Sequence, residues 1–273
     1  MRTIDRLKSM LGDVPGDTLE VRIRAGRAVQ YRRMRGDSFG PVMPAERLPG
    51  LLAALADHSL HSRNADLRQG YFTMSDGCRV GACGRLIWDG DRVRGMAEVG
   101  SICVRVCREI DGAADGFYDA LFEGGRLQSA LIVSPPGMGK TTALRAAARR
   151  LSEDGYNVCI ADERRELAAC VGGVPTLDVG TRTDVMDGCP KHIAIMVLLR
   201  AASPQVIVTD EIGDVRDAQA LSEAARCGAS VLASAHAAGF EALNKRKCVS
   251  TEVFSIGILL GDVPGRVKEI RRL

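Results

Sequence analysis

The second half of the chain alternates between short apolar runs and longer segments suited to helices. Apolar, mostly β-branched runs of four or five residues that end at polar residues are typical of buried parallel strands. Strand and helix alternation predicts a mainly parallel sheet with right-handed crossovers. The predicted strands are 130–133, 157–161, 206–209 and 230–233, the helices are 141–152, 192–202 and 218–227, and a hairpin of 256–260 with 267–270 completes the sheet.

The first half has a different pattern, with short strands separated by turn residues. Leu19–Arg24 and Ile102–Val106 alternate apolar and polar residues, as half-buried strands do. Tyr71–Met74 and Arg79–Gly81 flank Ser-Asp-Gly and predict a hairpin. With a helix predicted over Leu48–Leu60, this half is expected to be a small α+β domain.

These two patterns divide the chain. We expect an N-terminal α+β domain over residues 1–110, a linker over 111–126 that begins with the run DGAADG, and an α/β domain over 127–273.

Composition limits the class of protein. The 273 residues are 46% hydrophobic, which supports a substantial core, and the net charge of +3 is too small to indicate nucleic-acid binding. No run of about twenty apolar residues predicts a membrane span, and the N-terminus lacks the apolar segment of a secretory signal. Nine cysteines without Cys-x-x-Cys spacing indicate reduced thiols in a cytosolic protein and argue against zinc.

The most specific motif follows the first strand of the α/β domain. Residues 134–141 read SPPGMGKT, a strand-to-helix loop suited to a nucleoside triphosphate such as ATP. Backbone amides around Gly137 and Gly139 can turn toward phosphate, and the following helix adds its dipole. Ser134 replaces the usual first glycine. The expected nucleotide contacts are Pro136, Gly137, Met138, Gly139, Lys140, Thr141 and Thr142, with the Thr141 hydroxyl on Mg²⁺.

A second motif, VIVTDE at residues 206–211, places two acids at a strand end. Ligands of open α/β sheets bind at that edge. Asp210 is expected to hold Mg²⁺, directly or through water, and Glu211 to orient or deprotonate the attacking water. By itself the motif is equally compatible with a solvated acidic turn.

Two further strand ends carry polar residues. His236 follows the strand 230–233 and is expected to sense the γ-phosphate through a hydrogen bond. Residues 162–166 read DERRE, and the sequence leaves open whether these charges are simply solvated or serve water positioning or a subunit contact.

The order SPPGMGKTT, DERRE, DVMDGCPK, LLRAASPQVIVTDEIG and ASAHA resembles the stage III sporulation AA family, which is similar to ATPases of type II and type IV secretion and pilus systems. The segments EVRIRAGR, SDGCRVGACGR and CVRVCREIDGAAD extend the resemblance to nearly the whole chain. It implies a RecA-like P-loop ATPase core that binds ATP and Mg²⁺, with Lys140, Glu211 and His236 in catalytic roles. Glu163 lies in the region of the acidic box of secretion ATPases.

The resemblance also implies partners and a location. It implies a ring of identical subunits, most simply a hexamer, at the cytoplasmic face of a membrane on the mother-cell side of an endospore-forming bacterium. Membrane-embedded channel proteins would be its partners, and contact with the membrane itself would be peripheral. The chain lacks the four-cysteine zinc module of larger secretion ATPases, and the docking domain is reduced to about a hundred residues.

Two alternatives remain at this point: a nucleotide-gated assembly switch, and an ATPase that binds single-stranded nucleic acid. DNA or RNA is not expected, because the chain has one Trp, four Tyr and six Phe and offers few platforms for base stacking. Arginines of the first half could clamp a neighbouring subunit's nucleotide. They are Arg22, Arg24, Arg32, Arg33, Arg35, Arg79, Arg85, Arg105 and Arg108.

Overall fold

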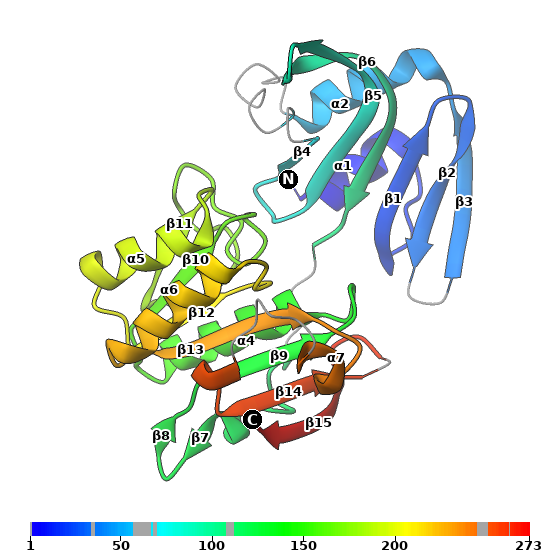
Figure 1. Cartoon of the computed structure of the whole chain (residues 1–273). Coiled ribbons are helices and arrows are strands. Elements are labelled where there is room, and N and C mark those ends of the chain that lie inside the picture. Colours follow the sequence, from blue (N-terminus) through cyan, green and yellow to red (C-terminus); the bar gives the residue numbers. More distant parts are fainter. Residues whose placement is uncertain are drawn as a thin grey trace. The chain divides into compact units, whose positions relative to one another are not determined.

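The computed structural model describes residues 2–33, 36–56, 67, 70–107, 112–244, 251–261 and 263–273. The chain divides into two compact units, residues 1–108 and 109–273 (Figure 1). Each unit has its own hydrophobic core and its own sheet.

The second unit is built on a seven-stranded sheet in the order β11-β10-β12-β13-β9-β14-β15. Every neighbouring pair is parallel except β14 with the edge strand β15, which form an antiparallel hairpin. The strands are β9 (Ala130–Ser134), β10 (Val158–Asp162), β11 (Thr183–Asp187), β12 (Val206–Thr209), β13 (Ser230–His236), β14 (Ile256–Leu260) and β15 (Val267–Arg272).

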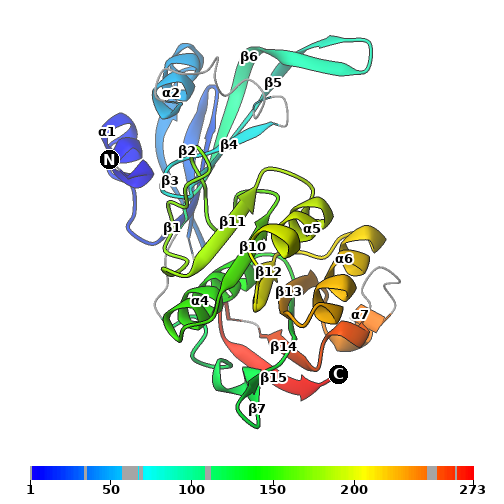
Figure 2. The same ribbon diagram turned by 90° about the vertical axis from the view of Figure 1, so that its left-hand side faces the viewer.

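Helices cover both faces of this sheet, which gives three layers (Figure 2). One face packs on α4 (Lys140–Glu153), whose Ala143, Leu144 and Ala147 are fully buried. The other face packs on α5 (Lys191–Ala201), α6 (Val215–Arg226) and the short α7 (Phe240–Asn244). Strands buried on both faces account for the continuous apolar runs in the sequence.

Parallel pairing brings several strand ends to one edge of the sheet. Ser134 at the end of β9 pairs with His236 at the end of β13. On the other side of β13, Thr209 pairs with Ala233 and precedes Asp210. The polar residues that the sequence places after separate strands therefore meet at the carboxyl edge.

The first unit is a six-stranded antiparallel sheet in the order β3-β2-β1-β6-β5-β4, and among its described residues two helices pack on the sheet. The strands β5 and β6 form a long hairpin. The elements are α1 (Thr3–Leu11), β1 (Thr18–Arg24), β2 (Arg27–Arg33), β3 (Gly36–Met43), α2 (Leu48–Leu55), β4 (Tyr71–Thr73), β5 (Arg79–Asp89) and β6 (Arg92–Arg105).

The fold class is confirmed: a mainly parallel α/β unit follows a smaller α+β unit. The predicted helix 48–60 ends earlier, at Leu55, and residues 57–60 lie outside the described part. The third predicted helix of the α/β unit begins at Val215 rather than 218, because the Asp214 side chain accepts the Arg216 amide and caps it. In the described part of the chain, no helix is long and apolar enough to cross a membrane.

The segment expected as a linker packs on the second unit instead. The side chains of Ala114, Phe117, Tyr118 and Leu121 are at most 3% exposed and belong to the core on the α4 side of the sheet. A short ribbon, β7 (Phe122–Glu123) with β8 (Arg126–Leu127), continues from there to β9. Apolar residues at this spacing form a helical turn that packs against α4. The glycine-rich start of the segment is typical of a linker and gives no sequence signal for this contact.

We expect Phe117→Ala to lower the free energy of unfolding of the second unit by about 3 to 5 kcal/mol, because it opens a cavity in a packed core. Denaturation followed by circular dichroism measures this change. Phe39→Ala, at a side chain that is 67% exposed, is the control and should change stability by no more than about 0.5 kcal/mol. Equal effects of the two substitutions would mean that residue 117 lies in a true linker.

Candidate functional site

The loop from β9 to α4 has the backbone of an anion cradle. Gly137 and Gly139 have φ angles of 79° and 87°, in the left-handed region that glycine adopts without strain. A Cβ on Gly137 would meet nothing within 4 Å, so this position needs glycine for conformation and not for space. Lys140 opens α4 directly after Gly139, and Thr141 and Thr142 lie in its first turn. The loop therefore presents backbone amides and a helix N-terminus together.

Lys140 is buried, with 5% of its surface exposed, and its ammonium group is held by the loop itself. Its Nζ lies 2.9 Å from the Ser134 carbonyl, 3.1 Å from the Ser134 hydroxyl and 3.0 Å from the Pro135 carbonyl. Ser134, which stands where the usual motif has glycine, thus supplies a side-chain acceptor. Burial lowers the pKa of Lys140 to about 8, and the carboxylate of Glu211 opposes that shift.

His236 links Lys140 to the acid after β12. Its Nδ1 lies 2.8 Å from Lys140 Nζ and its Nε2 lies 3.4 Å from Glu211 Oε1. Because the ammonium group can only donate, Nδ1 accepts and the ring proton is assigned to Nε2, facing the carboxylate. The structure therefore brings Lys140, His236 and Glu211, which are far apart in sequence, into one chain of polar contacts.

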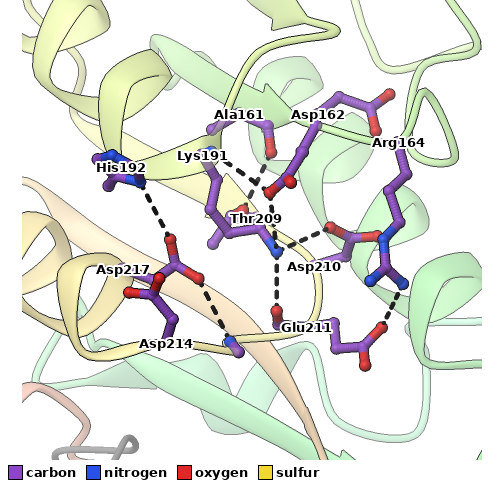
Figure 3. A network of polar contacts seen from close by, with 12 residues as sticks. Ala161, Asp162, Arg164, Lys191, His192, Thr209, Asp210, Glu211, Asp214 and Asp217 are labelled. Atoms are coloured by element: carbon purple, nitrogen blue, oxygen red, sulfur yellow. Dashed lines mark hydrogen bonds and ion pairs between the residues drawn. The ribbon is translucent and has the colours of Figure 1, made fainter. Parts of the chain in front are cut away.

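Contacts with neighbouring residues hold both the backbone and the side chain of Glu211 in place (Figure 3). Its φ is 33°, a conformation that costs a residue other than glycine about 1 to 3 kcal/mol. Its N–H donates to the Ser234 hydroxyl at 2.9 Å, and its carbonyl accepts from Lys191 Nζ at 2.8 Å. Its second carboxylate oxygen accepts from Arg164 Nη1 at 2.9 Å. These contacts aim the Glu211 side chain back at His236.

Lys191 is a site residue that the sequence reasoning missed. It is 4% exposed at the first position of α5, and its Nζ also lies 3.6 Å from Glu163 Oε2 and 4.0 Å from Asp210 Oδ1. A buried lysine amid two carboxylates and a carbonyl serves as their counter-charge. The segment DVMDGCPK, which ends at this lysine, was the available signal.

Asp210 fits the Mg²⁺ position expected for it. Its Oδ1 is buried and accepts no hydrogen bond among the described residues, since Lys191 stands too far away to donate one. Burial raises the pKa of Asp210 to about 7, and the Lys191 charge opposes this shift. A carboxylate oxygen here and the Thr141 hydroxyl in the first turn of α4 are donors of the kind that Mg²⁺ prefers.

No three His, Cys, Asp or Glu side chains in the described residues are grouped to hold a metal by themselves. A magnesium ion at Asp210 would therefore need phosphate oxygens or water as further ligands, as in a nucleotide complex.

The acid at the end of β10 has a structural role that neither sequence alternative included. Asp162 is fully buried, and its carboxylate accepts the amide N–H groups of Glu166, Leu167 and Ala168 at 2.8 to 3.2 Å. Burial raises its pKa, and these three donors oppose the shift. Asp162 thereby shapes the loop that carries Glu163 and Arg164 to the site.

A second missed feature is the turn between β14 and β15. The Gly265 N–H donates to the Met138 carbonyl at 3.0 Å, and a Cβ on Gly139 would lie 3.2 Å from the Gly265 nitrogen. The turn therefore rests directly on the phosphate loop, and no sequence motif marks this contact.

Most arginines considered as trans-acting groups have partners within the first unit. Arg22 and Arg105 pair with Glu20, and Arg33 pairs with Asp17 at 2.6 Å. Arg24 donates to Gln30, Arg79 lies over the Tyr71 ring, and Arg85 pairs with Glu98. Arg35 and Arg108 lie outside the described residues.

The architecture matches solved structures of an ATPase and of a pilus retraction motor. The structure of the Legionella pneumophila ATPase DotB aligns with a TM-score of 0.60 at 16% identity, covering 89% of this chain and 72% of that one. The pilus retraction motor PilT, solved with ADP bound, aligns with a TM-score of 0.60 at 15% identity, covering 95% of this chain and 78% of that one. At these identities the likeness establishes a fold class, the one that the chain shares with these two proteins.

The sequence narrows this class to one family. The family model described as Sporulation stage III, protein AA matches residues 14–272. Stage III sporulation protein AA of Bacillus subtilis is 36% identical over 252 residues, which are 89% of this chain and 82% of that protein. The chain belongs to the stage III sporulation protein AA family.

We expect Lys191→Met to lower the free energy of unfolding of the second unit by about 1 to 3 kcal/mol, because the Glu211 carbonyl loses its donor. Denaturation followed by circular dichroism measures the change. Lys268→Met, at an exposed lysine of β15, is the matched control and should stay within about 0.5 kcal/mol of the unsubstituted protein. Indistinguishable stabilities of the two variants would contradict the role given to Lys191.

Proposed function

We propose that this protein is an Mg²⁺-dependent ATPase. One observation carries the proposal: Lys140, His236 and Glu211, from three different elements, form a continuous chain of contacts beside the buried carboxylate of Asp210. Support comes also from the fold, which is shared with proteins described as an ATPase and as a retraction motor with ADP bound.

In this proposal the loop amides from Gly137 to Lys140 and the first turn of α4, with Thr141 and Thr142, bind the phosphates, and Pro136, which has no N–H, only shapes the loop beside them. Lys140 exchanges its contacts with Ser134 and Pro135 for β- and γ-phosphate oxygens. Asp210 and Thr141 hold Mg²⁺, which supplies neutralisation of phosphate charge when bound.

Glu211 is the proposed base. It accepts a proton from, or orients, the water that attacks the γ-phosphate, and the in-line displacement needs little else from the protein. His236 lies between Lys140 and Glu211, so it can relay the state of the phosphate to the base through its two ring nitrogens.

We expect Glu211→Gln to lower the rate of ATP hydrolysis by at least about a hundredfold, the scale of a lost general base, while leaving ATP affinity within a few-fold. Phosphate release and nucleotide binding are measured on the same preparation. Glu223→Gln, at a glutamate of α6 paired with Arg226, is the matched control and should hydrolyse normally. Hydrolysis by Glu211→Gln at the unsubstituted rate would remove Glu211 from this role.

We also propose that the protein works as a ring, most simply a hexamer, at the mother-cell face of a membrane. There it would power a secretion-like channel toward the forespore, with membrane-embedded sporulation proteins as partners. This rests on membership of the sporulation family together with the secretion-ATPase fold. The two units of residues 1–108 and 109–273 would then be the docking and ATPase domains.

We expect the mass of the protein in solution to rise to that of a closed ring on adding Mg²⁺ and a nonhydrolysable ATP analogue. The physical reason is that the negative charge of the bound triphosphate attracts an arginine of the neighbouring subunit and so stabilises the contact between subunits. Light scattering at several protein concentrations measures this. A protein that stays monomeric at high concentration with analogue bound would contradict the ring.

One feature favours a second candidate, a nucleotide-gated assembly switch with slow hydrolysis. Both carboxylate oxygens of Glu211 already face cations or donors, Arg164 at 2.9 Å and His236 at 3.4 Å, so the base is restrained until these contacts change. Turnover of the ring with its membrane partners decides between the candidates. A negligible rate there favours the switch, and a rate of about 1 s⁻¹ or more, within the range typical of enzymes, favours the motor.

A further inference from the structure

The turn that joins β14 to β15 has the geometry of a type II β-turn. The Arg266 N–H donates to the Val263 carbonyl at 3.0 Å, which closes a four-residue turn with Pro264 and Gly265 at its centre. The ring of Pro264 restricts its φ to a negative value, and Gly265 has a φ of 79°. This combination defines type II, in which the third residue needs a positive φ and is most often glycine.

The turn type decides which way the central peptide unit faces. Type I and type II turns differ by a rotation of this unit through about half a turn. In the turn seen here, the Gly265 N–H faces the phosphate loop and donates to the Met138 carbonyl at 3.0 Å. In a type I turn the Pro264 carbonyl would face the loop instead, and two carbonyl oxygens cannot bond to each other. The bond to the loop therefore depends on the positive φ of Gly265.

This bond fixes the orientation of the peptide unit between Met138 and Gly139. The peptide bond is trans. In a trans peptide unit the carbonyl and the N–H point in opposite directions. Because Gly265 holds the Met138 carbonyl, the Gly139 N–H faces away from the turn and is left free to serve the anion cradle.

The lack of a side chain at Gly139 allows the turn to approach this closely. A Cβ there would lie 3.2 Å from the nitrogen of Gly265 and 3.6 Å from its Cα, which are backbone atoms and cannot rotate aside. A Cβ on Gly137 would meet nothing within 4 Å. Glycine is therefore needed at position 137 for conformation alone, and at position 139 also for contact with the turn.

The contact with the turn does not compete with a bound phosphate. Lys140 Nζ contacts the carbonyls of Ser134 and Pro135, and the proposed function requires it to leave both for phosphate oxygens. The Met138 carbonyl accepts from Gly265 instead, and as an acceptor it has nothing to offer an anion. The turn can therefore keep holding the loop while Lys140 changes partners.

We propose that Gly265 is a positioning residue of the phosphate loop. Its N–H, aimed by the type II turn, holds the Met138 carbonyl so that the Gly139 N–H stays directed at a bound phosphate. The inference rests on the proposed function, because it takes this loop to bind the phosphates of ATP. It gives the turn between β14 and β15 a role in phosphate binding that depends on backbone geometry.

The test uses two substitutions of Gly265 that differ in the φ they tolerate. Space does not separate them, because a Cβ at this position would meet nothing within 4 Å. Asn adopts a positive φ more readily than most residues, whereas β-branched Val rarely does. We expect Gly265→Val to weaken binding of a nonhydrolysable MgATP analogue by about tenfold or more, the scale of one hydrogen bond to a charged group. Gly265→Asn should stay within about threefold of the unsubstituted protein, and calorimetry on the full chain gives the dissociation constants.

Gly228→Val is the matched control. Gly228 also has a positive φ, 89°, and a Cβ there would meet nothing within 4 Å. It precedes the start of β13, at the opposite edge of the sheet from His236. Its substitution strains the backbone in the same way, so it should lose stability but bind the analogue within about threefold of the unsubstituted protein.

Three outcomes would overturn the positioning role and leave the proposed function intact. They are an unchanged affinity in Gly265→Val, an equal loss of affinity in Gly265→Asn, and an equal loss in Gly228→Val. If the unsubstituted protein does not bind the analogue at all, the proposed function fails and the positioning role fails with it, which is a result distinct from these three.

Discussion

The candidate site depends on the parallel pairing of β9 and β13. This pairing aligns Ser134 with His236, so the strand that carries the phosphate loop ends beside the strand that carries the histidine. Lys140 then reaches both Ser134 and His236 from the start of α4. A shift of one residue in this register would turn the His236 side chain to the other face of the sheet and break the path to Glu211.

The carboxyl edge of the sheet concentrates charged groups that are expensive to bury. Lys140, Asp162, Lys191 and Asp210 are all at most 5% exposed. Asp162 is compensated by three amide donors, Lys191 by the Glu211 carbonyl, and Lys140 by the loop and His236. Asp210 alone among these four keeps a buried oxygen without a hydrogen-bond donor, and its raised pKa reflects this burial. Buried charge that is only partly compensated is typical of sites that bind an ion or a charged substrate.

Backbone strain adds to this organisation at one residue. The positive φ of Glu211 persists because Ser234 and Lys191 hold its N–H and carbonyl from opposite sides. Ser234 belongs to β13 and Lys191 to α5, so the orientation of the Glu211 side chain depends on how these two elements pack. Rigid positioning of this kind is what a hydrolytic site needs, since a small displacement of a base is costly in rate.

The local sequence determined the fold class, the strand ends and the phosphate loop, because apolar runs, glycines with positive φ and a lysine before a helix are short-range signals. The tertiary structure alone decided which distant groups meet. Lys191 enters the site because α5 begins where its first side chain reaches Glu163, which follows β10, and the Glu211 carbonyl, which follows β12. Gly265 rests on the loop because β14 pairs with β9. Asp162 became a structural acceptor through amides of the loop that follows it. Four residues of the expected linker, Ala114, Phe117, Tyr118 and Leu121, became part of the core through apolar surface supplied by other segments. Whether a polar residue binds a ligand or a neighbouring backbone depends on contacts between elements, which sequence spacing does not encode.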